Sequence, residues 1–527
     1  MPTVNANKGS MYALNNLQKT ERELTGAIES ISSGKRINHA GDDAARAAIS
    51  SRMRAQLSAM QQSVRNAADV MSLSQVAEGA LDESSKVLQR IRELAIQSAS
   101  DVVNGEERLY IQTEVNQLLK ELDRVTRDTK FNEIAVLDGS FADRRFQIGS
   151  HEREAATISI GNLRTEKIGV HQVRTDATSG ETNLATAAKS GSTDQIADED
   201  FTIHGLLGSS TIDVVANESA KSIAEKVNLQ FDNTAVSATA STNLKIQAKH
   251  STTANTDTTV SITLTGKNST GRTVSAGITL GTAVGNSDIS ALSDAINAYS
   301  AETGIISVLS GDKSAIYLTQ DEGLDIQITN TDFAECGDAA THMLVATGID
   351  TRLQDAAGDD ILSGSAVTVY DTAYAGGSGT ANTDDVIVSG QVTMNSSHTF
   401  TVITSNTNAG LFESSPGAAT LDKVSEISLR TRSKSLDALK VVDRALDKIH
   451  MERAKLGAIM SRMEHVIDNL SNVATNTETA RGRMEDANFA EESAKLARAQ
   501  ILQQSAMAMI AQASQTQRNV LTLLQGN

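Results

Sequence analysis

Hydrophobic residues recur at a coiled-coil spacing in the last quarter of this 527-residue chain. Two series of positions repeat every seven residues, the second lying three positions after the first, and a single charged residue interrupts them. The first series is Leu439, Leu446, Arg453, Met460 and Ile467, and the second is Val442, Ile449, Leu456, Met463 and Leu470. This pattern predicts a long coiled-coil helix. Residues 43–104 and 106–127 can supply its partner, with Asn104-Gly105 as the turn between them.

The first and last segments of the chain carry apolar series that match each other. After Arg498 the only charged side chain is Arg518, which does not suit a free helix in water. Because a seam of small residues buries little area alone, we infer that the two segments pair and that the pair packs against neighbouring subunits. An ordinary intramolecular helix pair is the alternative. The predicted polymerisation seam is Leu14, Leu17, Leu24, Ile28 and Ile31 with Ala499, Leu502, Ala506, Met509, Ala513, Val520 and Leu523.

The region between the helical segments, residues 170–415, is rich in Thr, Ser, Gly, Asp and Val. Apolar and polar residues alternate in 211–215, 260–264 and 325–328, which predicts β-strands there. The region also contains an internal repeat, because residues 220–228 resemble residues 289–297 at an offset of 69 positions. The aligned apolar pairs are Ile223 with Leu292, Val227 with Ile296, and Val236 with Ile305. Two α+β modules follow from this repeat, with a third, more degenerate module between 350 and 410.

Composition narrows the classes of function. Aromatic residues make up 3% of the chain and Trp is absent, which favours thin modules packed by aliphatic side chains. The 2 prolines, Pro2 and Pro416, leave long helices unbroken. The net charge of -18 without a basic stripe argues against nucleic-acid binding. The first residues lack the apolar core of a secretory signal, and no apolar stretch reaches membrane-spanning length, so we expect no membrane insertion. The single cysteine, Cys336, excludes an intramolecular disulfide framework.

Catalytic and cofactor motifs are not found in the sequence. The segment 151–155 begins like a zinc-protease helix, but it lacks the second histidine. The glycine-rich segment 376–379 lacks the lysine and the following helix of a phosphate-binding loop. We therefore expect no enzyme activity, no cofactor and no metal site.

Short blocks at both ends of the chain closely resemble the bacterial flagellins. The blocks cover the first 160 and the last 110 residues and stand in the order expected for the family. They are residues 33–45, 88–97, 129–132, 453–458, 487–491 and 519–524. Three positions depart from the family pattern: the family usually has Ser where His39 stands, Gly near Arg46, and Gly where Glu133 stands. These single changes put only local loop geometry in doubt.

The resemblance implies a multidomain α+β protein. A long antiparallel helical coiled-coil bundle would form from the paired N- and C-terminal regions, with an inserted β-rich outer region of α+β modules. The expected domains are an inner terminal coiled coil, a helical bundle with a β-hairpin, and a variable outer region. Their boundaries are 1–43 with 484–527, 44–172 with 415–483, and 173–414, the last divided into modules at 195–268, 269–347 and 348–414.

The function implied is that of a structural subunit of the extracellular flagellar filament, secreted through the flagellar export apparatus, largely unfolded, and assembled at the filament tip for swimming. The implied partners are copies of the chain itself, an export chaperone, the filament cap, the hook-junction proteins and host innate receptors. Two alternatives are a flagellin-like hook–filament junction protein and, in a different class, a coiled-coil surface adhesin. The adhesin would need a membrane anchor, which the sequence lacks.

The resemblance also implies two surface sites. In flagellins that Toll-like receptor 5 detects, one helical face contacts both the receptor and neighbouring subunits. The matching residues here are Gln89, Arg90, Leu94, Gln97 and Glu114. A β-hairpin takes part in the family's switch between filament supercoil forms, and a plain edge hairpin is the alternative. The matching residues here are Phe146, Gln147, Ile148, Gly149, Ile158 and Ile160.

Overall fold

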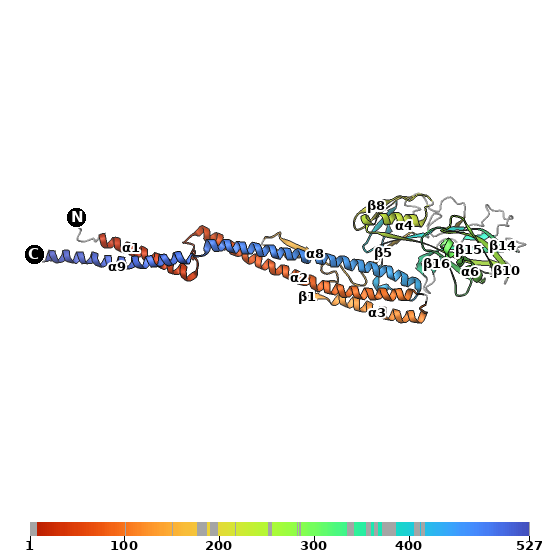
Figure 1. Ribbon diagram of the computed structural model, residues 1–527, viewed down its shortest axis with the longest axis horizontal. Helices are drawn as coiled ribbons and strands as arrows, with labels where there is room; N and C mark the ends of the chain where they lie inside the picture. Colours follow the sequence, from red (N-terminus) through yellow and green to blue (C-terminus); the bar gives the residue numbers. More distant parts are fainter. Residues whose placement is uncertain are drawn as a thin grey trace. The chain divides into compact units, whose positions relative to one another are not determined.

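The computed structural model describes residues 8–100, 102–149, 151–175, 187–189, 199–216, 218–250, 256–281, 283, 286–334, 342–354, 360–362, 367–370, 386–404, 412 and 417–525. The chain forms two compact units, and each is built from segments far apart in the sequence (Figure 1). The helical unit contains residues 1–80, 129–161 and 452–527, and the mixed unit contains residues 81–128 and 162–451.

Four long helices make up most of the helical regions. They are α1 (Lys8–Ser33), α2 (Ala44–Ala99), α8 (Arg432–Glu485) and α9 (Phe489–Gln525). Both apolar series predicted for residues 439–470 lie on the buried or half-buried side of α8, which confirms the predicted helix. The charged interruption, Arg453, is half-buried, and its Nη2 lies 3.9 Å from Oε1 of Glu78 on α2. The heptad pattern therefore tolerates this arginine because α2 supplies a counter-charge.

Two small β-hairpins belong to the helical unit. Strands β1 (Lys130–Phe131) and β2 (Ile134–Ala135) form the first, and β3 (Arg144–Gln147) and β4 (Ala155–Ile158) form the second. The turn of the first hairpin contains Asn132 at φ 48° and Glu133 at φ 65°. Positive φ at both turn residues is the geometry for which Asn-Gly is preferred. Glu133 thus occupies a left-handed position, where glycine would be favoured.

The helical part of the mixed unit packs three segments together. Helix α3 (Gly105–Asp128) follows the turn predicted at Asn104-Gly105. The backbone N–H of Glu107 donates to Oδ1 of Asn104 at 2.9 Å, and the N–H of Asn104 donates to Oε2 of Glu107 at 3.1 Å. This reciprocal pair is a capping box that fixes the start of α3. Buried residues from α2, α3 and α8 are Leu88, Ile91, Leu94, Val115, Leu122, Val441 and Val442.

The remainder of the mixed unit is built on sheets. The largest has the order β12 (Ile306–Leu309), β13 (Ala315–Gln320), β9 (Ser237–His250), β19 (Gln391–Ser396), β5 (Gly169–Arg174), β22 (Thr420–Lys423). Strand β15 (His342–Gln354) also pairs with β9, and β16 (Asp360–Leu362) and β17 (Val367–Tyr370) pair with β15.

The mixed unit contains two further sheets. One has the order β11 (Arg272–Leu280), β10 (Thr256–Thr265), β14 (Ile326–Ala334), β18 (Val386–Val388), β6 (Ala187–Lys189). The other has the order β21 (Gly417–Ala418), β20 (Thr401–Thr404), β7 (Phe201–His204), β8 (Ser209–Ile212). A 3-10 turn at Val424–Glu426 leads toward α8. The strand predicted at 260–264 is confirmed, and that predicted at 325–328 is present from Ile326 onward. Strand β8 ends at Ile212, before the predicted end at residue 215.

The predicted internal repeat is present as a structural repeat. Helices α4 (Ala220–Leu229) and α5 (Phe231–Thr234) correspond to α6 (Ser290–Asn297) and α7 (Ser300–Thr303). Asn228 bonds both backbone groups of Ala238, and Asn297 bonds the backbone groups of Ser307 in the same way. The aligned residues Ile223, Val227 and Val236 and their partners Leu292, Ile296 and Ile305 are all buried, at 1% exposure or less. The boundaries of the outer modules, including the third, stay a prediction, and much of 348–414 lies outside the described residues.

An ion pair joins the two repeats. Oε2 of Glu322 lies 2.6 Å from Nζ of Lys221 in α4, and its Oε1 lies 2.7 Å from Nζ of Lys267 in the β10–β11 turn. These two ammonium groups, Lys221 first, lower the pKa of Glu322 to about 2. Within the described residues, no helix is long and apolar enough to cross a membrane.

Candidate functional site: the paired helices α1 and α9

Helices α1 and α9 lie side by side in the helical unit (Figure 1). On each helix the less exposed positions alternate at spacings of three and four residues, as in a coiled coil. On α1 they include Ser10, Ala13, Leu17, Thr20, Leu24, Ala27 and Ile31. On α9 they include Glu492, Leu496, Ala499, Gln503, Ala506, Ile510 and Ala513. The two helices therefore pair through a narrow stripe of small and medium-sized side chains.

Only part of the predicted seam faces this contact. Leu17, Leu24, Ile31, Ala499, Ala506 and Ala513 lie on the less exposed stripes. Leu14, Ile28, Leu502 and Met509 are instead exposed, and the second series of α9 in the contact is Leu496, Gln503 and Ile510. The prediction that one face carries both series is wrong for the pairing of α1 with α9, because α9 has apolar residues on two faces and α1 covers only one. Val520 and Leu523 belong to α9, and their side chains lie outside the described residues.

The turns that join α1 to α2 and α8 to α9 bind each other through the backbone. The N–H of Arg36 donates to the carbonyl of Glu485 at 2.7 Å, and the N–H of Ala487 donates to the carbonyl of Gly34 at 2.9 Å. Gly34 has φ +69°, the left-handed conformation that ends helices at low cost with glycine. The segment 33–45, which resembles the family's hinge, is thus tied to the turn after α8.

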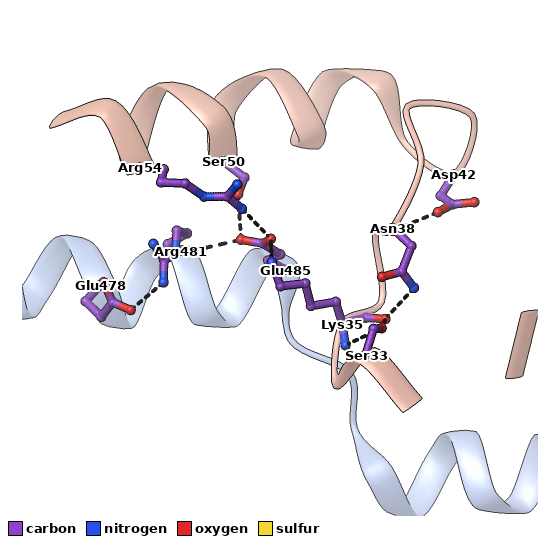
Figure 2. Close-up of polar contacts among 9 residues, drawn as sticks. All are labelled: Ser33, Lys35, Asn38, Asp42, Ser50, Arg54, Glu478, Arg481 and Glu485. Carbon is purple, nitrogen blue, oxygen red and sulfur yellow. Dashed lines mark hydrogen bonds and ion pairs between the residues drawn. The ribbon is translucent and has the colours of Figure 1, made fainter. Parts of the chain in front are cut away.

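The Glu485 carboxylate is the centre of this junction (Figure 2). Its Oε1 lies 2.6 Å from Nζ of Lys35 and 2.9 Å from Nη2 of Arg54, and its Oε2 accepts from Oγ of Ser50 at 2.8 Å. Arg481 adds a longer contact of 3.7 Å. The side chain is 8% exposed, so these groups replace the water that a carboxylate loses. The Lys35 ion pair is the largest cause that lowers the pKa of Glu485, and the hydrogen bond from Ser50 adds to it.

A second carboxylate shapes the loop before α2. Oδ2 of Asp42 accepts from the backbone N–H of Asn38 at 2.9 Å and of His39 at 2.8 Å. These two backbone bonds, that of His39 first, lower the pKa of Asp42. Oδ1 of Asp43 accepts from the N–H of Arg46 at 3.0 Å and so caps the start of α2. The unusual His39 places its Nε2 2.8 Å from Oε1 of Glu29 on α1.

A cavity of about 500 Å³ lies where α1, this loop and α9 meet. Its charged lining includes acidic Glu23, Glu29, Asp42 and Glu492 and basic Arg36, Lys495 and Arg498. Glu492 is buried and pairs with Lys495 at 2.8 Å. Within the described residues, no cluster of histidine, cysteine and carboxylate side chains could hold a metal ion.

The predicted β-hairpin is present, with Phe146 opposite Ala156. Ile158 and Ile160 are buried, at 1% exposure each, and Phe146 stacks near Phe141 with ring centroids 6.4 Å apart. Nδ2 of Asn66 on α2 donates to the carbonyl of Gln147 at 2.8 Å. At Gly149, an added Cβ would lie 2.4 Å from Cβ of Glu154, so glycine is required. The hairpin is attached to α2 through Asn66, while residues 151–154 of its turn are exposed.

The residues predicted as a receptor and lateral-contact face lie in the mixed unit. Gln89, Arg90, Gln97 and Glu114 are exposed, and Nη2 of Arg90 lies 2.8 Å from Oε1 of Glu114. Leu94 is 2% exposed, so its assignment to this face is wrong. It belongs to the stripe of α2 that packs into the core, three positions after Ile91, which is also buried.

Sequence reasoning missed Glu485 and the second α9 series. Glu485 stands in a charged stretch of α8 with no motif of its own, and its partners Lys35, Ser50 and Arg54 lie more than 400 positions away. The only signal that pointed to this junction was the resemblance of residues 33–45 and 487–491 to family blocks.

Comparisons with known proteins agree with this arrangement. Residues 4–142 match the bacterial flagellin N-terminal helical region, and residues 439–524 match the bacterial flagellin C-terminal helical region. The B-type flagellin of Pseudomonas aeruginosa is 33% identical over 524 residues, with 99% of each chain covered. The flagellin of Salmonella rubislaw is 30% identical, with 99% of each chain covered, and flagellin B of Helicobacter pylori is 29% identical, with 96% of each covered. This chain therefore belongs to the bacterial flagellin family and is a structural subunit of the flagellar filament.

Proposed function

We propose that the subunit polymerises through the faces of α1 and α9 that their pairing leaves open. Leu14, Ile28, Leu502 and Met509 are 46%, 51%, 45% and 64% exposed in the single subunit. Full burial of one such side chain stabilises an assembly by roughly 1.5–3 kcal/mol. This exposure of large apolar side chains on both helices, together with the scarcity of charge in α9 after Arg498, is the observation that carries the proposal. In the filament, equivalent faces of neighbouring subunits would cover them.

We also infer that folding of these helices is coupled to assembly. The stripe between α1 and α9 contains Ala27, Ala499, Ala506 and Ala513 and the polar Thr20, so it buries little apolar area. Such burial hardly offsets the entropy lost when two long segments become ordered. The helices would therefore order fully only where neighbours add contacts, at the growing filament tip.

This coupling fits export of the chain in a largely unfolded state. A chain with 2 prolines has few slow isomerisation steps to repeat after export. The partners that we propose are the flagellar export apparatus, an export chaperone that covers the apolar faces before export, the filament cap, and the hook-junction proteins. All four would meet α1 or α9 before or at the moment of assembly.

The Glu485 junction and the β3–β4 hairpin have proposed roles in the filament form. Glu485 would fix the direction in which the α1–α9 pair leaves α2 and α8, so that subunits repeat the same angle. The hairpin is attached to α2 through Asn66, and residues 151–154 of its turn are exposed. An exposed turn on a rigid base is suited to two alternative contacts with a neighbour, which is what a supercoil switch requires.

Removal of residues 499–527 tests the polymerisation proposal. We expect the truncated chain to form no filaments under assembly conditions, while the outer β-rich region keeps its fold. Electron microscopy measures the first and limited proteolysis of the outer region the second. Normal filaments from the truncated chain would refute the proposal. A matched control replaces the exposed, polar Gln500 and Gln504 by serine and should assemble normally.

Recognition by a host innate receptor is the second proposed role. The exposed residues Gln89, Arg90, Gln97 and Glu114 support it, and the Arg90–Glu114 ion pair holds the two helices' side chains in one surface. Arg90→Ala should lower activation of cells that carry Toll-like receptor 5 by monomeric subunit. Lys86→Ala, one turn earlier on α2, is the control. Equal activation by all three proteins would count against this role.

A further inference from the structure

The two repeats of the mixed unit have the same fold and different exposed surfaces. Repeat 1 consists of β7, β8, α4, α5 and the start of β9, and repeat 2 consists of β10, β11, α6, α7 and β12. Their equivalence extends to the turns. A Cβ added to Gly205 would lie 1.9 Å from the carbonyl oxygen of Thr234, and one added to Gly266 would lie 2.6 Å from that of Thr303. Where an exposed residue of one repeat is replaced by a different kind of residue in the other, the shared fold does not require it.

Repeat 1 exposes an apolar cluster at one end of its helix, which we name the leucine patch. It consists of Leu206 and Leu207 in the β7–β8 turn, Leu229 at the end of α4, and Phe231 in α5. Their exposed fractions are 47%, 65%, 79% and 43%. The turn lies against the α4–α5 segment, because Oγ of Ser210 is 3.0 Å from Oε1 of Gln230. Figure 1 places β8 next to α4.

Apart from Tyr299, which is half-buried and packs against the core, the equivalent surface of repeat 2 is polar or small. The β10–β11 turn carries the polar sequence 267–270, Ala298 stands at the position of Leu229, and Ser300 stands at the position of Phe231. Repeat 2 folds with these residues, so the apolar side chains of repeat 1 are not required by the fold. Clustered exposed apolar residues of this kind mark an interaction surface.

Repeat 2 has the opposite pattern on its edge strand. Ile306 and Val308 on β12 are 48% and 53% exposed, and Val308 stands opposite Tyr317 of β13, which stands opposite Lys245 of β9. Nζ of Lys245 lies 5.8 Å from the ring centroid of Tyr317. We name these four residues the β12 patch. In repeat 1 the positions of Ile306 and Val308 hold the polar residues Ser237 and Thr239.

The two patches are also complementary in charge. Glu225 lies one turn before Leu229 on α4, and Asp232 follows Phe231, so acidic groups flank the leucine patch. Both carboxylates are exposed. The β12 patch carries the ammonium group of Lys245. Opposite charges around apolar contacts favour one pairing over others.

We propose that the leucine patch of one subunit docks on the β12 patch of a second copy in the filament. The inference rests on assembly of the filament, which brings many copies together. A helical polymer is held by contacts between two different surfaces of successive copies, not by self-complementary ones. The two reciprocal patches, one on each repeat, supply such a pair. Both are exposed within a single subunit, so they are available to another.

Mixed filaments of single-cysteine subunits test this contact. Subunits with Leu229→Cys are copolymerised with subunits with Val308→Cys, both with Cys336→Ser, and oxidised. Electron microscopy first shows that filaments have formed, and mass spectrometry then measures the disulfide-linked peptides. We expect the 229–308 link to exceed that in unassembled subunits at the same concentration by tenfold or more, on the order expected for held proximity.

The matched control exploits the repeat. Subunits with Ala298→Cys, the equivalent of Leu229, are copolymerised with the same Val308→Cys subunits and should give little link. Charge reversal by Asp232→Lys should lower the 229–308 link severalfold, and Lys245→Glu in the other subunits should restore it. The proposal would be overturned by normal filaments in which the 229–308 and 298–308 links form equally, or in which neither link forms. Because such filaments have assembled, this result would leave the proposed polymerisation through α1 and α9 unaffected.

Discussion

Nζ of Lys35 lies 2.6 Å from Oε1 of Glu485, although the two residues are 450 positions apart in the chain. The same carboxylate bonds Ser50 and Arg54 on α2. Because Glu485 is the last residue of α8, its contacts tie the end of one long helix to the turn that separates α1 from α2. The junction between two helix pairs is thus held by one almost fully buried charge.

Replacement of Glu485 by glutamine should weaken the filament. The change leaves Lys35 and Arg54 without their counter-charge in a partly buried site, where such bonds contribute on the order of 1–3 kcal/mol. We expect filaments of Glu485→Gln to dissociate at a lower temperature than the natural ones in a light-scattering melt. Glu478→Gln removes a carboxylate that is 55% exposed from the same helix and should have little effect. Equal decreases in the dissociation temperature for both variants would show that the buried Glu485 contributes no more than an exposed carboxylate.

The stability of the mixed unit should depend on pH through Asp325. Burial raises the pKa of Asp325 to about 6 from 3.8, against hydrogen bonds from Ser389 and Gly390, and its Oδ1 has no hydrogen-bond partner. A raised pKa means that the neutral form is favoured in the folded state. The contribution to stability is therefore full below pH 3.8 and is lost as pH rises through about 6.

Urea unfolding of the soluble chain measures this dependence. The contribution of Asp325 should make the free energy of unfolding about 1 kcal/mol lower near pH 8 than near pH 5. Asp325→Asn, which stays neutral, should abolish this part of the difference. A variant with the same pH dependence as the natural chain would show that Asp325 does not titrate in this range.

The left-handed turn residue Glu133 gives a stabilising substitution. At φ 65° the Cβ of Glu133 crowds the backbone, and glycine, which has no Cβ, avoids that strain. Glu133→Gly should raise the free energy of unfolding of the helical unit by about 1 kcal/mol. Glu133→Ala keeps the Cβ and should give no gain. Thermal unfolding of the two variants separates relief of strain from removal of charge. An equal gain in stability in both variants would show that removal of the charge, and not relief of strain, is the cause.

The Asn228 and Asn297 side chains should contribute equally to their repeats. Each bonds the N–H and the carbonyl of one strand residue at 2.8–2.9 Å. Replacement by alanine leaves these backbone groups without partners at a cost of about 1–2 kcal/mol. Asn233→Ala, which loses only an exposed bond to Gln230, serves as the control in urea unfolding. A loss confined to one of the two repeats would contradict their equivalence.

The sequence predicted elements whose signal is local and periodic. The α8 series from Leu439 to Leu470 identified a helix, and the 69-position repeat identified α4 and α6, because burial imposes a regular spacing. The series in α9 could not be assigned to one partner, since Leu502 and Leu496 are equally apolar and only the position of α1 decides which is covered. Leu94 was misplaced for a related reason: family blocks identify a helix, and packing decides which of its faces is exposed.

Long-range polar contacts were beyond prediction for a different reason. Glu485, Lys35 and Arg54 have no shared spacing, and charged residues are common on exposed helices. A carboxylate that will be buried can be recognised only once the fold has brought its hydrogen-bond donors together. The leucine patch and the β12 patch could not be predicted from the repeat either. The repeat was recognised from the residues that its two copies share, and the copies differ at these surface positions.

The central claim is that the outward faces of α1 and α9, and not their paired faces, drive polymerisation. Electron microscopy of a chain with Leu502→Ser and Met509→Ser tests it most directly. Both side chains point away from the α1 contact, so the pair keeps its inner stripe of Leu496, Ala499 and Ala506. The account predicts no filaments from this variant under conditions in which the Gln500→Ser, Gln504→Ser control assembles. Filaments of normal length and number from the variant would contradict it.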